Sequence, residues 1–363
     1  MGVSVAGEYG CGRGAEEVAE LLERLRSIDE ECRIEAAREI RWLTKTYLKN
    51  RQKFSGAVKP LVSMLRSGSQ EAAQAAILAL LNLAVKDERN KIKIVDAGAL
   101  APLCDFLQSP DSILQEYAAA SLLTLSASTP NKTTICSAGA IPLLITALTC
   151  GTPQAKIDAA SALFNLATLP ENLSPILNSH PIHPIITLLK SINKSSKTAE
   201  KCCALIESLL CFHMSTAAAA LTSVEGGVLA VVEALEDGSV ASKEHAVGAL
   251  LAMCQSDRSR YREVILNEGA IPGLLELTVQ GTPAAQAKAR DLLKLLRESP
   301  RPRTALQADT LENVVCGIVS RIESVDQTGV AMAKKMMAEM VQVSMEQSLR
   351  HLQQRAFFAR SDL

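Results

Sequence analysis

A repeated turn signal governs what this chain of 363 residues can fold into. A glycine followed by small or apolar residues recurs at steps of 42, 41, 87 and 43 residues, at Gly56, Gly98, Gly139, Gly226 and Gly269. The step of 87 residues holds two periods, and His180 stands near its midpoint. Periods in the low forties are typical of solenoids built from short helices. The chain is therefore predicted to fold as a row of similar helical units.

Each period has the same internal order of helices and turns. A short helix is expected to end at the glycine, which can adopt the left-handed conformation that closes a helix. A second helix follows, with proline in its first turn. The pairs Thr152-Pro153 and Thr282-Pro283 are then an N-cap and a first-turn proline that open a third helix. The third helices are apolar on more than one face, so each unit is expected to be stable only when stacked on its neighbours.

Counting third helices gives seven repeats and an all-α fold. The repeats are predicted to occupy residues 30–298, after an irregular segment at 1–14 and a capping helix at 15–29. A linker rich in proline and charge at 299–303 leads to a helical tail at 304–363. That tail contains methionines at helical spacing, and we leave open whether it caps the last repeat or binds a partner.

Composition narrows the classes of partner. Lys and Arg total 38 against 39 Asp and Glu, so the chain has a formal net charge of -1 and no general attraction for nucleic acid. The longest apolar stretch, residues 72–85, is shorter than the ~20 residues of a membrane-spanning helix. A protein that binds neither nucleic acid nor membrane is predicted.

The cysteines indicate a reducing compartment. There are ten, with no CxxC motif, and several lie inside apolar helical patterns. Cys104, Cys202, Cys203 and Cys254 are expected to be buried, reduced thiols. This usage predicts localisation in the cytoplasm and nucleus.

Three motifs resemble armadillo repeats: "ALLNLA" ending at Ala84, "ALFNLA" ending at Ala167, and the turn "AGAIPLL". More narrowly, "YREVILNEGAIPGLLELTVQGTP" and "KKMMAEMVQVSMEQSLRHLQQRA" resemble plant armadillo proteins related to the repeat domain of U-box ubiquitin ligases. The resemblance implies a right-handed superhelix whose third helices line a concave groove for extended segments of partner proteins. No part of the sequence resembles a U-box, so any ligase activity is expected to come from a partner.

The resemblance also implies a binding position on each third helix. Aligning these helices places one residue from each at an equivalent position: Arg41, Asn82, Thr124, Asn165, Ser208, Ala252 and Lys294. In armadillo proteins the matching asparagine holds the main chain of a bound peptide, since a carboxamide both donates and accepts hydrogen bonds. Asn82 and Asn165 match that motif. The alternative is that these groups only satisfy the ends of neighbouring helices.

Basic residues surround this position in the first repeats. Arg38 lies one turn before it, and Lys45, Lys86, Ser128, Leu169 and Phe212 lie one turn beyond it. We predict a groove that is basic at its N-terminal end, and a partner segment that is acidic at one end and apolar at the other. A solvated basic flank is the alternative. The candidate groove comprises Arg38, Arg41, Lys45, Asn82, Lys86, Thr124, Asn165, Leu169, Ser208 and Phe212.

The sequence gives little support for a nuclear import adaptor, a metal site or a catalytic site. Nuclear import adaptors of the armadillo class have a tryptophan four residues before each asparagine, where this chain has Leu78 and Ser161. The single tryptophan, Trp42, is expected to belong to the core. His180 and His183 have no nearby Cys or carboxylate pair to complete a metal site, and no catalytic triad can be placed.

The sequence thus predicts a non-catalytic, monomeric scaffold without cofactor or metal, which binds proteins in its groove. The first alternative is an accessory or substrate-recognition component of ubiquitin ligation, with ubiquitin-ligase components as partners. The second alternative is a nuclear transport adaptor.

Overall fold

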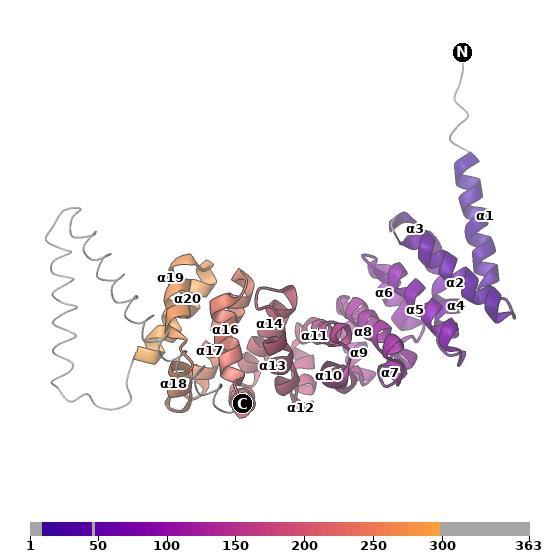
Figure 1. Cartoon of the computed structure of the whole chain (residues 1–363). Coiled ribbons are helices and arrows are strands. Elements are labelled where there is room, and N and C mark those ends of the chain that lie inside the picture. The colour runs from indigo at the N-terminus through magenta and orange to yellow at the C-terminus, as the bar shows by residue number, and fades with distance from the viewer. Residues whose placement is uncertain (1–8, 46–47, 298–363) are drawn as a thin grey trace, which may run out of the picture. The chain divides into compact units, whose positions relative to one another are not determined.

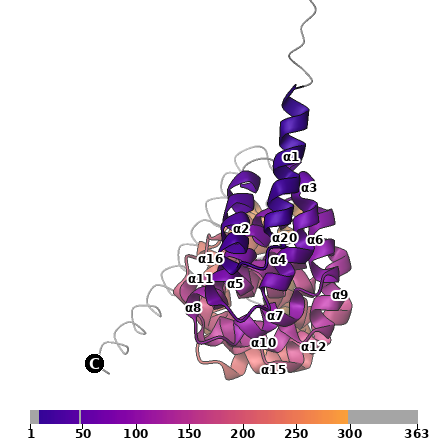
Figure 2. The ribbon, with the colours of Figure 1, turned by 90° about the vertical axis from the view of Figure 1, so that its right-hand side faces the viewer.

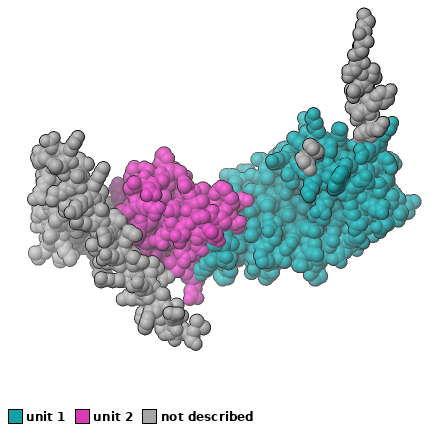
Figure 3. Space-filling view, turned by 45° about the horizontal axis from the view of Figure 1, so that its top comes forward, with its two compact units in different colours: residues 1–192 teal, residues 193–363 magenta. Residues whose placement is uncertain are grey.

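The computed structural model describes residues 9–45 and 48–297, and within these ranges every regular element is a helix. The chain divides into two compact units, Met1–Ile192 and Asn193–Leu363, which Figure 3 colours teal and magenta. The predicted linker and tail at 299–303 and 304–363 lie outside the described residues.

The first unit contains thirteen α-helices and two short 3₁₀ helices (Figure 1). They are α1 (Tyr9–Arg24), α2 (Glu30–Thr44), α3 (Leu48–Lys53), η1 (Phe54–Ala57), α4 (Val58–Met64), α5 (Gln70–Ala84), α6 (Glu88–Asp96), α7 (Leu100–Leu107), α8 (Ser112–Ser126), α9 (Thr129–Ser137), α10 (Ala140–Cys150), α11 (Pro153–Ala167), η2 (Pro170–Asn172), α12 (Leu173–Asn178) and α13 (Ile182–Ser191).

The third helices of the first unit form one row. Helix α2 packs on α5, α5 on α8 and α8 on α11. Figure 2 shows these four helices on one side of the unit and α3, α6, α9 and α12 on the opposite side. Equivalent residues of successive repeats are therefore brought to one face, which we call the third-helix face.

The second unit follows the same plan, and its described part, residues 193–297, contains seven helices: α14 (Lys197–Phe212), α15 (Met214–Ser223), α16 (Gly227–Asp237), α17 (Val240–Ser256), α18 (Arg258–Asn267), α19 (Ile271–Gln280) and α20 (Pro283–Arg297). Its third helices α14, α17 and α20 pack in sequence order. With α2, α5, α8 and α11 they complete the seven third helices that the period predicts.

The predicted glycine turns are confirmed at four positions. Gly98, Gly139, Gly226 and Gly269 have φ between 59° and 84°, the left-handed region that closes a helix without steric cost for glycine. His180 takes the equivalent place with φ 56°, so the backbone turn persists where the glycine is missing. Gly56 differs, because it lies within the 3₁₀ helix η1 rather than at a left-handed turn.

The threonines at the starts of α11 and α20 bind both the backbone of their own helix and a side chain of the preceding repeat. The Thr152 hydroxyl accepts from the Ala155 amide at 3.2 Å, as an N-cap should, and also donates to Glu116 of α8. The Thr282 hydroxyl does the same with the Ala285 amide, at 3.1 Å, and with Glu244 of α17. The predicted caps are confirmed, and each links two neighbouring repeats.

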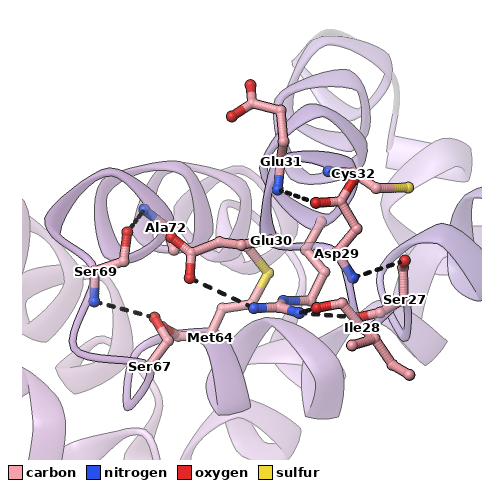
Figure 4. A network of polar contacts seen from close by, with 11 residues as sticks. Ser27, Ile28, Asp29, Glu30, Glu31, Cys32, Met64, Ser67, Ser69 and Ala72 are labelled. Carbon is pink, nitrogen blue, oxygen red and sulfur yellow. Dashed lines mark hydrogen bonds and ion pairs between the residues drawn. The ribbon is translucent and has the colours of Figure 1, made fainter.

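At the start of α2, Figure 4 shows a related network. The Asp29 carboxylate accepts from the backbone amides of Glu31 and Cys32, which caps the helix. The Arg33 guanidinium donates to the carbonyl oxygens of Ser27 and Ile28 at 2.9 and 2.8 Å. These bonds fix the turn between α1 and α2.

The core is filled by small and aliphatic side chains from all three helices of each repeat. The four cysteines that the sequence placed inside are buried, and the eight cysteines from Cys32 to Cys254 are free thiols. Burial raises the pKa of Cys203 to about 12, which keeps this thiol protonated.

Helix α1 begins at Tyr9, earlier than the capping helix predicted at 15–29, and ends at Arg24. Gly10, Gly12 and Gly14 have low helix propensity, which is why the sequence favoured a later start.

No single helix in the described part is long and apolar enough to cross a membrane; two bent pairs, α9 with α10 and α15 with α16, pass a test of length and composition.

Candidate functional site

The two predicted binding asparagines lie on the third-helix face of the first unit and are half-buried. The Asn82 Nδ2 donates to the main-chain oxygen of Arg41 on α2 at 2.8 Å. The Asn165 Nδ2 donates to the Leu123 carbonyl and the Ser126 hydroxyl of α8, both at 3.2 Å. Each amide nitrogen therefore satisfies the end of the preceding third helix, while the carboxamide oxygens have no hydrogen bond within the described residues.

The other aligned positions are less suited to hold a peptide. The hydroxyls of Thr124 and Ser208 donate to carbonyls of their own helices, Ala120 at 2.9 Å and Ala204 at 2.8 Å. Ala252 is buried, and Lys294 is exposed on α20. The Thr124 and Ser208 hydroxyls keep their lone pairs as acceptors, so they offer less than the bidentate reach of an asparagine.

The N-terminal end of the face is basic. Arg38, Arg41, Lys45 and Lys86 are all exposed, and Arg38 pairs with Glu71 of α5. Within residues 9–45 and 48–297 the other three form no ion pair. The cluster of Arg41, Lys45 and Lys86, which we call the basic cluster, therefore carries uncompensated positive charge.

A buried arginine, Arg51, joins two helix ends at the basic end of the third-helix face. The Arg51 guanidinium donates to the carbonyl oxygens of Thr44 and Lys45, at 3.0 Å each, and to that of Val85 at 2.7 Å. It thus joins the C-terminal ends of α2 and α5, which carry Lys45 and Lys86. Lys86 itself has φ 57°, a left-handed conformation outside the helix. The sequence did not predict this role of Arg51.

The expectation that Trp42 belongs to the core is wrong. Its side chain is 74% exposed, since it shares the solvent face of α2 with Arg38 and Lys45, four residues before and three residues after it. The buried face of α2 is made instead by Ile34, Ala36, Ala37, Ile40 and Thr44.

A second row of asparagines was missed. Asn90, Asn131 and Asn172 recur every 41 residues and are 1–2% exposed. The Asn90 Nδ2 donates to the carbonyls of Arg51 and Leu83, and the Asn131 Nδ2 to those of Lys91 and Leu125. The Asn172 Nδ2 donates to that of Leu166. These side chains are structural, and their shared spacing was the signal in the sequence.

The predicted apolar end of the groove is only partly exposed. Leu169 is half-buried before η2, and Ser128, one turn beyond Thr124, is fully buried. Phe212 is 41% exposed in the second unit and contacts His213 edge to face, with 4.8 Å between the ring centres. Ser208 and Phe212 lie in the second unit, and the other eight candidates lie in the first.

The third helices of the second unit carry a charged network that the sequence analysis did not identify. The Glu207 carboxylate of α14 contacts His245 Nδ1 of α17 at 2.6 Å and accepts from Lys288 Nζ of α20 at 2.7 Å. Burial raises the pKa of Glu207, but the two hydrogen bonds and positive charges outweigh burial and lower it overall. The isolated Gly248 in α17, beside this carboxylate, was the available signal.

Metal-ligand and catalytic groupings were sought among the described residues. In the described part of the chain, no group of three or more His, Cys, Asp or Glu side chains gathers as metal ligands would. The one carboxylate–imidazole pair, Glu207 with His245, has no hydrogen bond from His245 to a serine or cysteine there. His180 and His183, considered above for a metal, lie exposed at the turn before α13 and on it.

Comparison with known proteins identifies the family. Residues 17–316 match the model of the plant U-box protein ARM repeat region, and the chain belongs to this family. It is 32% identical over 285 residues to U-box domain-containing protein 17 of Arabidopsis thaliana, covering 66% of this chain and 38% of that protein. It is also 32% identical over 299 residues to U-box domain-containing protein 4 of Oryza sativa subsp. japonica, covering 69% and 40%. The chain spans about two fifths of the length of these curated relatives.

Solved structures agree on the fold. An engineered protein superposes with a TM-score of 0.68 at 23% identity, covering 92% of this chain and 77% of its own. A chain in a structure of the interaction between cadherin and beta-catenin superposes with a TM-score of 0.63 at 18% identity, covering 76% and 52%. With the family match, they confirm the predicted all-α armadillo solenoid, a class of protein-interaction fold.

Proposed function

We propose that the chain is a non-catalytic protein-binding scaffold, and that the third-helix face of the first unit binds an extended, acidic segment of a partner. The carboxamide oxygens of Asn82 and Asn165 would accept from main-chain amides of that segment, while the basic cluster attracts its carboxylates. Free thiols throughout the described part support a cytoplasmic and nuclear location.

One observation carries this proposal. Four third helices lie in a row, and one end of their shared face holds three exposed cations that form no ion pair with the described residues. Unpaired surface cations contribute little to folding, but they speed and orient the encounter with an oppositely charged segment. An extended peptide also needs acceptors at regular spacing, and Asn82 and Asn165 offer two on α5 and α11.

A peptide-display library selected on the wild-type chain tests the proposal. Selected peptides should be enriched in Asp and Glu, and they should bind at least about tenfold more weakly to a variant with Asn82→Ala and Asn165→Ala, since a lost hydrogen bond costs roughly 0.5–1.5 kcal/mol. Lys197→Glu, on an 87% exposed lysine of the second unit, is the control. Peptides that bind the double variant as tightly as the wild type would contradict the proposal.

A role as accessory or substrate-recognition component of ubiquitin ligation is the second candidate, and membership of the U-box ARM family favours it. The measurement is ubiquitination of a selected peptide, fused to a carrier, by a separately purified U-box ligase. Addition of this chain should raise the rate, and the asparagine double variant should not. An unchanged rate with the wild type counts against this role. A transport-adaptor role has less support, because Ser161 at one adaptor position is buried and Leu78 at the other is half-buried.

A further inference from the structure

A highly exposed aromatic side chain lies beside the basic cluster. Trp42 is 74% exposed, whereas tryptophan ordinarily buries most of its surface. It is the only tryptophan of the chain. Exposed tryptophans near charged groups are frequent binding anchors, because a large rigid ring loses little entropy on contact.

Trp42 lies among exposed cationic side chains. Arg38, Arg41 and Lys45 are exposed on the same face of α2, within one helical turn of the ring on either side. The Arg51 bonds to the carbonyls of Lys45 and Val85 bring the end of α5, with Lys86, to the same end of the face. Leu48 and Val85, 45% and 37% exposed, add apolar surface at these helix ends.

Buried hydrogen bonds hold the backbone beneath this surface. Arg51 is buried and donates to three carbonyls, and the buried Asn90 donates to the carbonyl of Arg51 and to that of Leu83 at the end of α5. The backbone that carries Lys45 and Lys86 is therefore held before any partner arrives. Such preorganisation reduces the entropic cost of binding.

We propose that Trp42 anchors the partner segment through a large apolar or aromatic side chain flanked by carboxylates. The proposal rests on the proposed function and specifies the chemistry of its partner. A cationic partner group is disfavoured, since Arg41 and Lys45 would repel it before it reached the ring. An apolar side chain on the ring, with carboxylates directed to the basic cluster, satisfies both the charge and the exposed apolar area.

The test uses the full chain and short synthetic peptides without tryptophan. In the first peptide a phenylalanine is flanked by glutamates; in the second the phenylalanine is serine; in the third the glutamates are glutamine. Trp42 emission then reports contact at this site, because no other tryptophan contributes. The first peptide should shift the emission to shorter wavelength and bind on the order of 30-fold more tightly than the second, as expected for a binding anchor.

Variants complete the experiment, with binding followed by anisotropy of labelled peptide. Trp42→Ala should weaken the first peptide on the order of 30-fold and leave the second unchanged, while Trp42→Phe should retain most of the affinity. Trp42 is exposed, so these changes leave the fold intact. Lys86→Glu should weaken both acidic peptides, and the control Lys197→Glu neither.

The outcomes separate the two proposals. Equal binding of the first two peptides, or full affinity in Trp42→Ala, overturns the role of Trp42 while the acidic-segment proposal stands. Failure of both acidic peptides to bind the wild type overturns the basic site as well. Tighter binding of single-stranded oligothymidine than of the first peptide would replace the protein segment with nucleic acid as the occupant, and overturns both.

Discussion

The Lys288 Nζ donates to Glu207 Oε1 at 2.7 Å, although the two residues lie 81 positions apart and on helices that are not adjacent in the row. The contact passes α17 at Gly248, where a Cβ would come 1.7 Å from the same carboxylate oxygen. The glycine therefore has a packing reason: it leaves room for a bridge that joins α14 and α20 across the helix between them.

Gly248→Ala should destabilise the chain despite the higher helix propensity of alanine. The new methyl group would displace the Glu207 carboxylate from Lys288 and His245, and overpacking of this kind costs about 1–3 kcal/mol. Urea denaturation gives the free energy of unfolding. In a Glu207→Ala background the carboxylate is gone, and the same substitution should stabilise by up to about 1 kcal/mol. The same sign in both backgrounds would contradict this explanation of the glycine.

Glu207→Gln should lower stability at neutral pH and much less in acid. The pKa of the folded Glu207 carboxyl is lowered, so its contribution is present above the unfolded value, about 4.3, and disappears as pH falls through the folded value. The difference in free energy of unfolding between wild type and variant, measured from pH 7 downward, should therefore shrink below about pH 4. A difference that stays constant to low pH would show that the network depends on shape and not on charge.

The two rows of asparagines should differ in what their removal does. Asn90→Ala leaves the carbonyls of Arg51 and Leu83 unsatisfied in the interior, which costs about 1–3 kcal/mol. Asn82→Ala frees the carbonyl of Arg41 in an exposed position, where water can solvate it, so its cost is about 1 kcal/mol or less. Thermal denaturation distinguishes them. A larger loss for Asn82→Ala would make the third-helix asparagine primarily structural.

His180→Gly should stabilise the chain. His180 holds φ 56°, where a side chain costs about 1–2 kcal/mol and glycine does not. The matched substitution is Gly139→Ala at φ 77°, where an added Cβ meets no atom within 4 Å, so only backbone strain opposes it. The melting temperature should rise for the first variant and fall for the second.

Arg51→Met should affect both folding and binding. The loss of three carbonyl bonds from a buried guanidinium lowers stability by several kcal/mol, since bonds to charged groups contribute about 1.5–3 kcal/mol each. Because the ends of α2 and α5 are then no longer joined, acidic peptides should bind more weakly at a temperature where circular dichroism shows the variant folded. Unchanged affinity would show that the basic cluster does not depend on this support.

Much of the fold could be predicted because it is periodic. The turn glycines and the Thr-Pro pairs act through local backbone chemistry, so the same residues produce the same turn at Gly98, Gly139 and Gly269. His180 shows the limit of this reasoning: the period predicted its place, whereas the left-handed backbone there is imposed by the surrounding repeat. The early start of α1 was missed for the opposite reason, since local glycine propensity favoured an irregular segment.

The candidate site was less predictable. Spacing placed Asn82 and Asn165 on one face, but their bonds to the preceding helix depend on how closely the helices approach. The error at Trp42 has a different origin. Hydrophobicity favours burial of a tryptophan, and only its register on α2 places it beside Arg38 and Lys45 on the solvent side. Long-range contacts such as Arg51 with Val85 have no local signature.

The buried asparagines 41 residues apart define a unit of length for changes to the array. Because the Asn131 side chain bonds to the carbonyls of Lys91 and Leu125 much as Asn90 does to those of Arg51 and Leu83, an internal deletion of one full period would leave each remaining amide opposite an equivalent acceptor. A deletion that is not a whole number of periods would leave buried donors and carbonyls unpaired. An array of this kind can therefore gain or lose whole repeats far more readily than single turns of helix.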